Sequence, residues 1–354
     1  MKLFTPGPIA MDPQTIAEAG KQSQYFRTPE FSSLMLDCVN MLRTVLGAPD
    51  SARMIFLTAS GSGAMEASVI NLFTPSDKVL VISGGTFGRR FKQICAIHHI
   101  PLESIDLEWN EAFQPDMLAP YENAGFTGML VNMCETSTGQ LYPMDEISGF
   151  CKRNGLCLVV DAISSFLCDD FDMTACGAAA VIISSQKGLA LQPGMSFVAV
   201  SEEAFETRCK KNEAASLYFG FTYYYPEILR GQTEFTPAIG IINQLHEKLR
   251  RLENSGGPSQ QIAYAGELAR YFRARLGENT GFTFPRYPLS NCVTPVFCPN
   301  NNAKAIVNTL RYTHDIFVVP AAGERADSSF RVAHMSPQLT TADIDQLIGL
   351  LADM

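Results

Sequence analysis

The chain has 354 residues, of which 46% are apolar and 18% are charged. This composition is typical of a folded globular protein and excludes an intrinsically disordered chain or a small disulfide scaffold. The net charge of −9 at pH 7 argues against a nucleic-acid-binding surface, which usually carries an excess of Lys and Arg. Composition and charge therefore favour a small molecule as the partner.

Three further patterns bear on location and metal binding. The opening sequence, MKLFTPGPIAMDP, lacks the apolar core of a secretory signal, and no apolar run is long enough to span a membrane, so we expect a cytoplasmic protein without a membrane partner. The ten cysteines are scattered singly, mostly inside apolar runs, which predicts buried reduced thiols. The five histidines show no metal-ligand spacing, and we expect no metal site.

The predicted elements begin with a helix and continue as alternating strands and helices. From Pro29 to Leu46 apolar residues recur on one helical face, and Pro29 suits a first helical turn. The predicted strands, each a short apolar run, cover 53–58, 78–83, 128–133, 156–161, 179–184 and 196–201. The helices predicted between them cover 63–73, 88–98 and 144–154. This alternation predicts an α/β core around a mostly parallel sheet.

The C-terminal part of the chain has a different pattern of predicted elements from the α/β core. A helix predicted over Ala238–Glu253 ends at the turn sequence Asn254-Ser-Gly-Gly-Pro258, where we place a domain boundary. The later elements are a helix at 260–276, strands near 293–297, 316–319 and 330–333, and a last helix opened by Thr340 or Thr341. We therefore expect a large domain over residues 1–254, with an N-terminal arm, and a smaller α+β domain over residues 255–354.

A turn rich in small residues follows the strand at 53–58 and opens the next helix. Its sequence, Ser60-Gly61-Ser62-Gly63, exposes backbone N–H groups at the positive end of a helix dipole, where phosphate groups bind. It matches neither the Walker pattern nor the dinucleotide pattern G-x-G-x-x-G. Taken alone, the segment is equally compatible with a phosphate cradle and with an ordinary helix N-terminus.

Two ionisable residues lie at the ends of later strands. Asp161 ends a strongly apolar strand, where open α/β sheets bind ligands, so a cationic heterocycle nitrogen is a candidate partner; a capping Asp is the alternative. Lys187 follows the strand at 179–184 among small and apolar residues, which favour an amine nucleophile; a solvated loop cation is the alternative. The turn, the carboxylate and the amine together are the parts that a pyridoxal phosphate enzyme requires.

With these parts in place, the chain resembles the class-V, fold-type I pyridoxal phosphate aminotransferases, in the branch of the alanine–glyoxylate (serine–pyruvate) and 2-aminoethylphosphonate–pyruvate transaminases. The resemblance runs over nearly the whole length. It is carried by FTPGP at 4–8, RTPEF at 27–31, SGSGAME at 60–66, GTFGRR at 85–90, ETSTG at 135–139, Asp161, SQK at 185–187, FTP at 235–237 and FRV at 330–332. It implies a large domain with a mostly parallel seven-stranded sheet and a smaller α+β C-terminal domain.

The resemblance also implies which residues bind pyridoxal 5′-phosphate. Lys187 would bind the aldehyde, and Asp161 would keep the ring nitrogen protonated. The phosphate would be bound within one chain by Ser60, Gly61, Ser62 and Gln186. Thr236 would reach the phosphate from the second subunit, which implies a homodimer with a composite active site.

Further residues complete the implied site. Phe87 would stack on the ring, with a core Phe as the alternative, and Ile163 belongs to the same cofactor-binding set. Ser137 would form a hydrogen bond with the ring oxygen of the cofactor. Arg331 would bind the substrate carboxylate, with a structural salt bridge as its alternative.

The implied reaction is a transamination. A small 2-amino acid, alanine or serine, gives its amino group to glyoxylate or pyruvate by a ping-pong Schiff-base mechanism in which the freed Lys187 amine is the general base. Transamination of 2-aminoethylphosphonate with pyruvate is the alternative, because the sequence around Cys134 is closer to the phosphonate enzymes and that at 185–187 is closer to the alanine–glyoxylate enzymes. A cysteine desulfurase-like lyase and a non-catalytic cofactor-binding protein are more remote, since no cysteine follows Cys298 and no length is spare for a DNA-binding domain.

Overall fold

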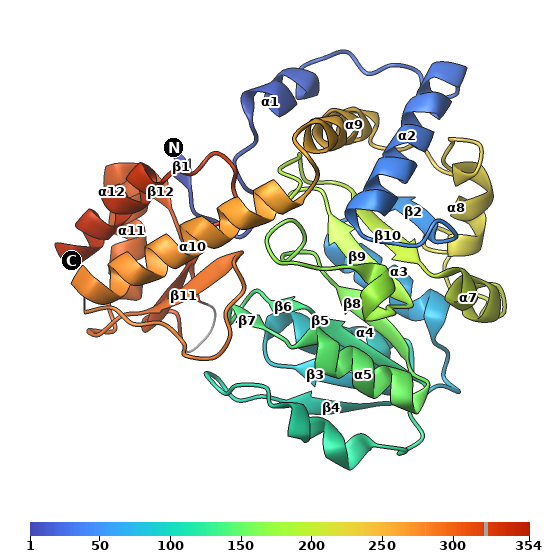
Figure 1. The fold of residues 1–354 in the computed structure, drawn as a ribbon, viewed down its shortest axis with the longest axis horizontal. Coiled ribbons are helices and arrows are strands. Elements are labelled where there is room, and N and C mark those ends of the chain that lie inside the picture. Colours follow the sequence, from blue (N-terminus) through green and yellow to red (C-terminus); the bar gives the residue numbers. More distant parts are fainter. Residues whose placement is uncertain (280, 322–324) are drawn as a thin grey trace.

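The computed structural model describes residues 1–279, 281–321 and 325–354. Its centre is a sheet of seven strands in the order β2-β10-β9-β8-β5-β3-β4 (Figure 1). The strands are β2 (Arg53–Leu57), β3 (Val79–Ser83), β4 (Leu102–Asp106), β5 (Gly128–Asn132), β8 (Cys157–Asp161), β9 (Ala180–Ser184) and β10 (Ser196–Val200). Strand β10 is antiparallel to both of its neighbours, and the other neighbouring pairs are parallel. The expected mostly parallel seven-stranded sheet is confirmed.

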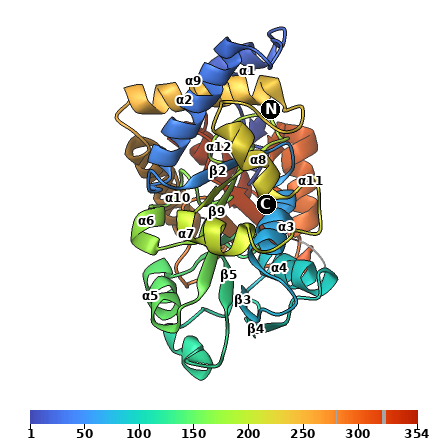
Figure 2. The same ribbon diagram turned by 90° about the vertical axis from the view of Figure 1, so that its right-hand side faces the viewer.

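The sheet is buried on both faces, because successive residues of a strand enter different hydrophobic clusters. In β2, Met54 and Phe56 pack on one face, whereas Ile55 and Leu57 pack on the other. The helices of the first face are α2 (Pro29–Val45), α5 (Met144–Asn154) and α9 (Ile239–Asn254). Those of the second face are α3 (Gly61–Leu72), α4 (Thr86–Ile97) and α8 (Phe221–Ile228). Figure 2 shows α5 on the opposite side of the strands from α3 and α4.

The helices predicted in this core form within two residues of their expected bounds. Helix α2 begins as expected at Pro29, and the Thr28 side chain accepts a hydrogen bond from Phe31 N at 3.2 Å. Strand β4 has no counterpart among the strands predicted from the sequence, because only Ile105 of its residues is buried and an edge strand lacks a continuous apolar run. The shorter elements are α1 (Pro13–Ala19), β6 (Cys134–Glu135), β7 (Gln140–Leu141), α6 (Met173–Cys176), α7 (Glu202–Ala204), a 3-10 helix at Pro115–Tyr121 and a π-helical turn at Phe205–Cys209.

The C-terminal part packs around its own antiparallel sheet. The elements are α10 (Ser259–Asn279), β11 (Val293–Phe297), α11 (Ala303–His314), β12 (Ile316–Phe317), β13 (Val319–Pro320), β14 (Ser329–Ala333) and α12 (Thr341–Ala352). Helix α12 begins, as expected, after Thr340, which forms a capping box with Asp343. The strand expected at 316–319 is two strands, because β12 pairs with β1 (Lys2–Leu3) while β13 pairs with β14.

The N-terminal end of the chain therefore lies with the C-terminal elements (Figure 1). Phe4, directly after β1, is buried in the same hydrophobic cluster as Leu268 of α10 and Phe330 of β14. The division into domains near residue 254 stays a prediction.

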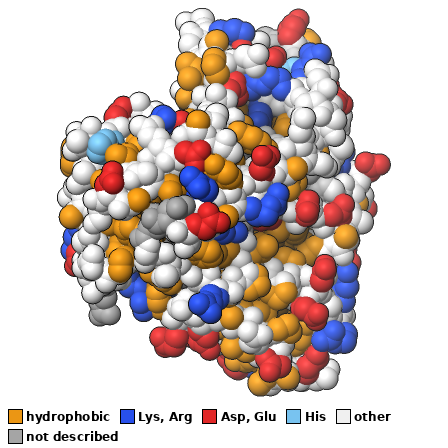
Figure 3. All heavy atoms as spheres, turned by 60° about the vertical axis from the view of Figure 1, so that its left-hand side comes forward, with side chains coloured by type: hydrophobic (Ala, Val, Ile, Leu, Met, Phe, Trp, Pro, Cys, Tyr) orange, Lys and Arg blue, Asp and Glu red, His pale blue; other side chains and the backbone are white. Residues whose placement is uncertain are grey.

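Surface charge and cysteines single out no site. On the face drawn in Figure 3, Lys and Arg side chains are interspersed with Asp and Glu. The ten cysteines are free thiols, and all except Cys157 are buried. Within the described ranges, no helix is long and apolar enough to cross a membrane, and no group of three or more side chains is placed to hold a metal ion.

Candidate active site

The parallel strands end at one edge of the sheet, and the residues that follow them line a cavity of about 120 Å³. Eight of the predicted site residues meet there: Ser60, Gly61, Ser62, Phe87, Asp161, Ile163, Gln186 and Lys187. Met65, Arg90, Thr136 and Ser164 complete the lining. The structure thus brings residues from five separate segments of the chain to one place.

Helix α3 begins at this cavity. Ser60 is its N-cap residue, and its side chain makes no capping hydrogen bond, so the hydroxyl is free to face the cavity. The first N–H bonded within the helix is that of Ala64, which donates to Ser60 O at 3.2 Å. The N–H groups of Gly61 and Ser62 therefore lie at the positive end of the helix, where an anion binds. Glycine is needed at 61, because a Cβ atom there would lie 2.5 Å from Ile163 Cδ1.

Two polar side chains extend this set of donors. The Ser184 hydroxyl donates to Gln186 Oε1 at 2.7 Å, which leaves the Gln186 amide NH₂ for the cavity. Arg90 Nη1 donates to Ser62 Oγ at 2.6 Å, and its guanidinium lies 5.0 Å from the centre of the Phe87 ring. The sequence reasoning assigned no role to Arg90. Its place one helical turn after Phe87 is the signal that identifies it.

Asp161 is a buried carboxylate at the end of β8, with 6% of its surface exposed. Its Oδ1 accepts a hydrogen bond from Ile163 N at 2.8 Å, and its Oδ2 accepts one from Asn132 Nδ2 at 2.5 Å. Burial raises the pKa of Asp161 to about 6, although both hydrogen bonds act in the opposite direction. A buried carboxylate with this pKa favours a cationic partner in the cavity.

The burial of Asp161 predicts a pH-dependent stability of the ligand-free protein. The folded-state pKa lies above the usual 3.8, so this group's stabilisation is fully present below 3.8 and is lost as the pH rises through about 6. We expect the loss between about pH 4 and about pH 7 to be about 2–3 kcal/mol smaller in the Asp161→Asn variant, measured by urea unfolding. Asp169, whose pKa burial also raises to about 6, contributes a residual loss to both proteins. Equal pH dependence of the two would contradict the prediction.

Lys187 follows β9 on a tight loop and points at the N-terminal arm. Its Nζ donates a hydrogen bond to Pro6 O, and its backbone O accepts one from Ala190 N at 2.7 Å. Burial lowers the pKa of Lys187, and the charge of Arg331 acts in the same direction, whereas Asp161 opposes both. A lowered pKa increases the uncharged fraction of the amine, which is the form that an amine nucleophile requires.

A second cavity of about 370 Å³ adjoins the first across residues 136–138. Ser137 and Arg331 line this second cavity and not the first. The Ser137 hydroxyl donates to Glu135 Oε1 at 2.6 Å and accepts a hydrogen bond from Thr86 N at 2.9 Å, which holds it on this side. Thr136 lines the first cavity, where Ser137 was expected.

Arg331 lies at the boundary of the two cavities. Its Nη1 donates to Thr136 O at 3.1 Å, and its buried Nε has no hydrogen-bond partner among the described residues. Burial lowers the pKa of Arg331, and the charge of Glu135 opposes this shift. Glu135 also accepts hydrogen bonds from Phe87 N and Gly88 N, each at 3.0 Å, and so caps the start of α4. The sequence reasoning assigned no role to Glu135, although it begins the ETSTG segment.

The structure of one chain does not bring Thr236 to the site. Thr236 is exposed and lines neither cavity. It lies in the segment between α8 and α9, two residues before Ala238, whose N–H donates to Thr58 Oγ1 at 3.2 Å. Thr236 is therefore available to another molecule.

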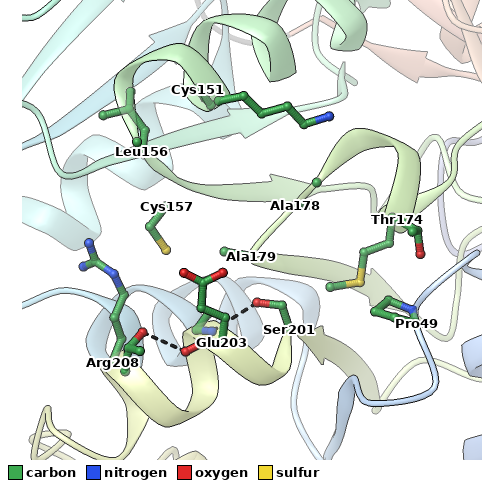
Figure 4. A pocket seen from close by; sticks show the side chains of 16 residues that line it. Pro49, Cys151, Leu156, Cys157, Thr174, Ala178, Ala179, Ser201, Glu203 and Arg208 are labelled. Atoms are coloured by element: carbon green, nitrogen blue, oxygen red, sulfur yellow. Dashed lines mark hydrogen bonds between the residues drawn. The ribbon is translucent and has the colours of Figure 1, made fainter.

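A wider cavity of about 640 Å³ lies at the opposite edge of the sheet, where β8 and β9 begin (Figure 4). Cys157, Glu203 and Arg208 are among the side chains around it. Arg208 is paired with Asp77 at 3.0 Å, and none of the predicted site residues lines this cavity. The gathering of chemical groups, and not cavity size, therefore locates the candidate site.

The chain is similar to known proteins over most of its length. The family model for class-V aminotransferases matches residues 14–343. The chain is 27% identical over 344 residues to the soluble hydrogenase 42 kDa subunit of Anabaena cylindrica, covering 95% of this chain and 88% of that protein. It is 31% identical over 290 residues to 2-aminoethylphosphonate–pyruvate transaminase of Pseudomonas aeruginosa, covering 77% and 76%. The crystal structure of alanine–glyoxylate aminotransferase from Nostoc sp. superposes with a TM-score of 0.92 at 26% identity, covering 99% and 94%. The chain belongs to the class-V aminotransferase family and is a pyridoxal phosphate-dependent aminotransferase.

Proposed function

We propose that this aminotransferase transfers the amino group of a small 2-amino acid, alanine or serine, to a small 2-oxo acid, glyoxylate or pyruvate, in a ping-pong cycle. The observation that carries the proposal is the meeting of Lys187 and Asp161 in one buried cavity, with Arg331 at its border. The likeness to the alanine–glyoxylate aminotransferase from Nostoc sp. supports small substrates.

The residues of the first cavity fit pyridoxal phosphate. The start of α3 at Ser60 and the Gln186 amide offer donors to the phosphate. Asp161 offers a buried carboxylate to a protonated ring nitrogen, and Ile163, which lines the same cavity, offers an apolar surface to the ring. We assign Phe87 to the opposite face of the ring.

Each residue of the site has a separate role in the proposed reaction. When bound, the cofactor supplies an aldehyde that binds amines and a ring that accepts the electrons released at the substrate α-carbon. Lys187 would hold that aldehyde through Nζ, and its amine would serve as the base that accepts the proton of the substrate α-carbon. Asp161 would hold the proton on the ring nitrogen, and Arg331 would orient the substrate by binding its carboxylate. The arm at Pro6 covers Lys187 and keeps water from it.

Gly7 of the N-terminal arm lies against the end of the Lys187 side chain. Gly7 has φ +124°, and a Cβ atom there would lie 2.6–2.8 Å from the end of the Lys187 side chain. We expect Gly7→Ala to weaken cofactor binding about tenfold, because the added Cβ atom would displace the Lys187 amine, and a distortion of this kind costs about 1–3 kcal/mol. Equilibrium dialysis with pyridoxal phosphate measures this.

Gly20→Ala is the matched control. Gly20 has φ −82°, and a Cβ atom there would meet nothing closer than 3.6 Å, so its affinity for the cofactor should equal that of the unchanged protein. The same weakening in both variants, or in neither, would show that the arm does not position Lys187.

We propose that Thr236 serves the active site of a partner subunit, since it is exposed and does not line the cavity of its own chain. A mixed dimer of Lys187→Ala and Thr236→Ala chains would then contain one fully intact site. We expect the mixture to show the cofactor affinity of the unchanged protein at roughly one site in four. If the mixture shows only the affinity of the Thr236→Ala homodimer, Thr236 acts in its own chain.

The amino donor is tested by single half-reactions. The cofactor-loaded protein is mixed with alanine, serine or 2-aminoethylphosphonate, and the visible absorbance of the bound cofactor is followed. We expect alanine or serine to bleach this absorbance at least about tenfold faster than 2-aminoethylphosphonate does. A faster reaction with 2-aminoethylphosphonate would identify the alternative, which the relative in Pseudomonas aeruginosa favours. No reaction with any of the three would refute the proposal.

A further inference from the structure

The second cavity holds more positive charge than a small 2-amino acid requires. Among the described residues, three guanidinium groups line it, those of Arg89, Arg325 and Arg331, against one carboxylate, that of Glu108. No acidic side chain of the described ranges lies within ion-pair distance of these three arginines. Guanidinium groups that share a cavity repel one another unless an anion joins them. The lining therefore has a charge surplus that an anionic ligand would neutralise.

The three arginines come from different elements and take different positions. Arg331 of β14 donates to Thr136 O, and its charge lowers the pKa of Lys187, which places it at the reacting end of the cavity. Arg325 lies over the Trp109 ring, 4.4 Å from its centre, on the wall formed by the loop after β4. Arg89, on the first turn of α4, donates from Nη2 to Thr86 Oγ1 at 3.4 Å.

The size and wall of the cavity add to the charge argument. Its volume of about 370 Å³ falls in the range of sites for ligands much larger than alanine or glyoxylate. Leu107 and Trp109 form an apolar stretch of the lining, which suits the methylene groups of a spacer. When Arg331 binds one carboxylate, the other two arginines, Arg89 and Arg325, remain for a second acidic group.

We propose that this cavity binds substrates with an acidic group at each end, the α-carboxylate on Arg331 and a distal carboxylate or phosphonate on Arg89 and Arg325. A ping-pong transaminase exchanges its amino acid–oxo acid pairs in one site, so the same site would accept a dianionic pair besides the small ones. This inference rests on the proposed function and adds a further substrate class to it.

Trp109 provides a direct readout of ligand binding, because it is the only tryptophan in the chain and contacts Arg325. The cofactor-loaded protein is titrated with glutarate, which has two carboxylates and no amine, and with butyrate, which has one. Tryptophan fluorescence gives the Kd of each ligand. We expect the Kd for glutarate to be about 10–100-fold lower than the Kd for butyrate. Titration with 3-phosphonopropionate shows whether the distal group preferred is a phosphonate. Equal affinities for glutarate and butyrate would overturn the inference.

Two variants assign the preference to the arginines. Arg325→Gln and Arg89→Gln should each reduce the glutarate-to-butyrate preference, and the ratio of kcat/KM for glutamate over alanine, by about tenfold or more. Arg311→Gln is the matched control, since Arg311 is exposed and outside the cavity. A parallel loss for both ligands, or no loss, would show that the arginines serve the structure only.

The fluorescence result stands apart from catalysis, since glutarate cannot react. If glutarate binds preferentially but no amino acid reacts, the proposed function fails and the dianion site stands. If alanine reacts and glutarate shows no preference, the dianion site fails alone.

Discussion

Lys187→Ala is expected to lower kcat by about 10⁴-fold with every amino donor, the upper end of what a positioned general base contributes. Among the residues that line the first cavity, Lys187 carries the only amine. Its burial and lowered pKa suit it both to bind an aldehyde and to accept a proton. Single-turnover absorbance changes with alanine, at saturating pyridoxal phosphate, measure the effect.

Three companion measurements separate chemistry from folding. Lys211→Ala removes an exposed lysine and should leave kcat unchanged. Lys187→Arg keeps the positive charge but lacks an amine nucleophile, so it should be as inactive as Lys187→Ala. A small alkylamine added to Lys187→Ala should restore part of the rate, because it supplies the missing base. Retention of more than about a tenth of kcat by Lys187→Ala would contradict the assignment.

Asp161→Asn is expected to lower kcat by about 10²–10³-fold, the usual cost of one well-placed charged group. The amide cannot hold a proton on the ring nitrogen, whereas the phosphate donors at the start of α3 are unchanged, so the cofactor should stay bound. The variant also fits the site. Asn132 Oδ1 has no hydrogen-bond partner among the described residues, and a turn of the Asn132 amide lets it accept a hydrogen bond from the new NH₂ group.

The matched control is Asp170→Asn, which removes an exposed carboxylate from the same segment and should retain full activity. Both variants are compared by the rate of the alanine half-reaction and by cofactor affinity from dialysis. If Asp161→Asn keeps full activity, or if it loses the cofactor as well as the rate, Asp161 does not act on the ring nitrogen.

The sheet was predictable wherever its strands are buried on both faces. Strands β3 and β9 are buried throughout and apolar except for a final serine, because neither face of these strands meets water. Strand β4 and helix α11 were not predicted, because their hydrophobic patterns are weaker. Ile105 is the one buried residue of β4, and α11 buries only Ala303, Ile306 and Leu310. Elements with so little buried surface leave little trace in the residue pattern.

The residues of the site were predictable to the extent that strand ends fix them. Asp161 ends one strand of the parallel part of the sheet and Lys187 follows another, and such strands end at the same edge. The division between the two cavities depends on distant contacts, such as that of Ser137 with Thr86 N, which no local pattern contains. The same holds for Arg325, whose position over Trp109 brings together two distant parts of the chain.

The attachment point of the cofactor tests the central claim most directly. Borohydride reduction of the cofactor-loaded protein fixes a pyridoxyl group on the amine that binds the aldehyde, and peptide mass mapping locates it. We predict the added mass on the peptide that contains Lys187, at one group per chain. A pyridoxyl group on a different lysine, or on none, would contradict the account.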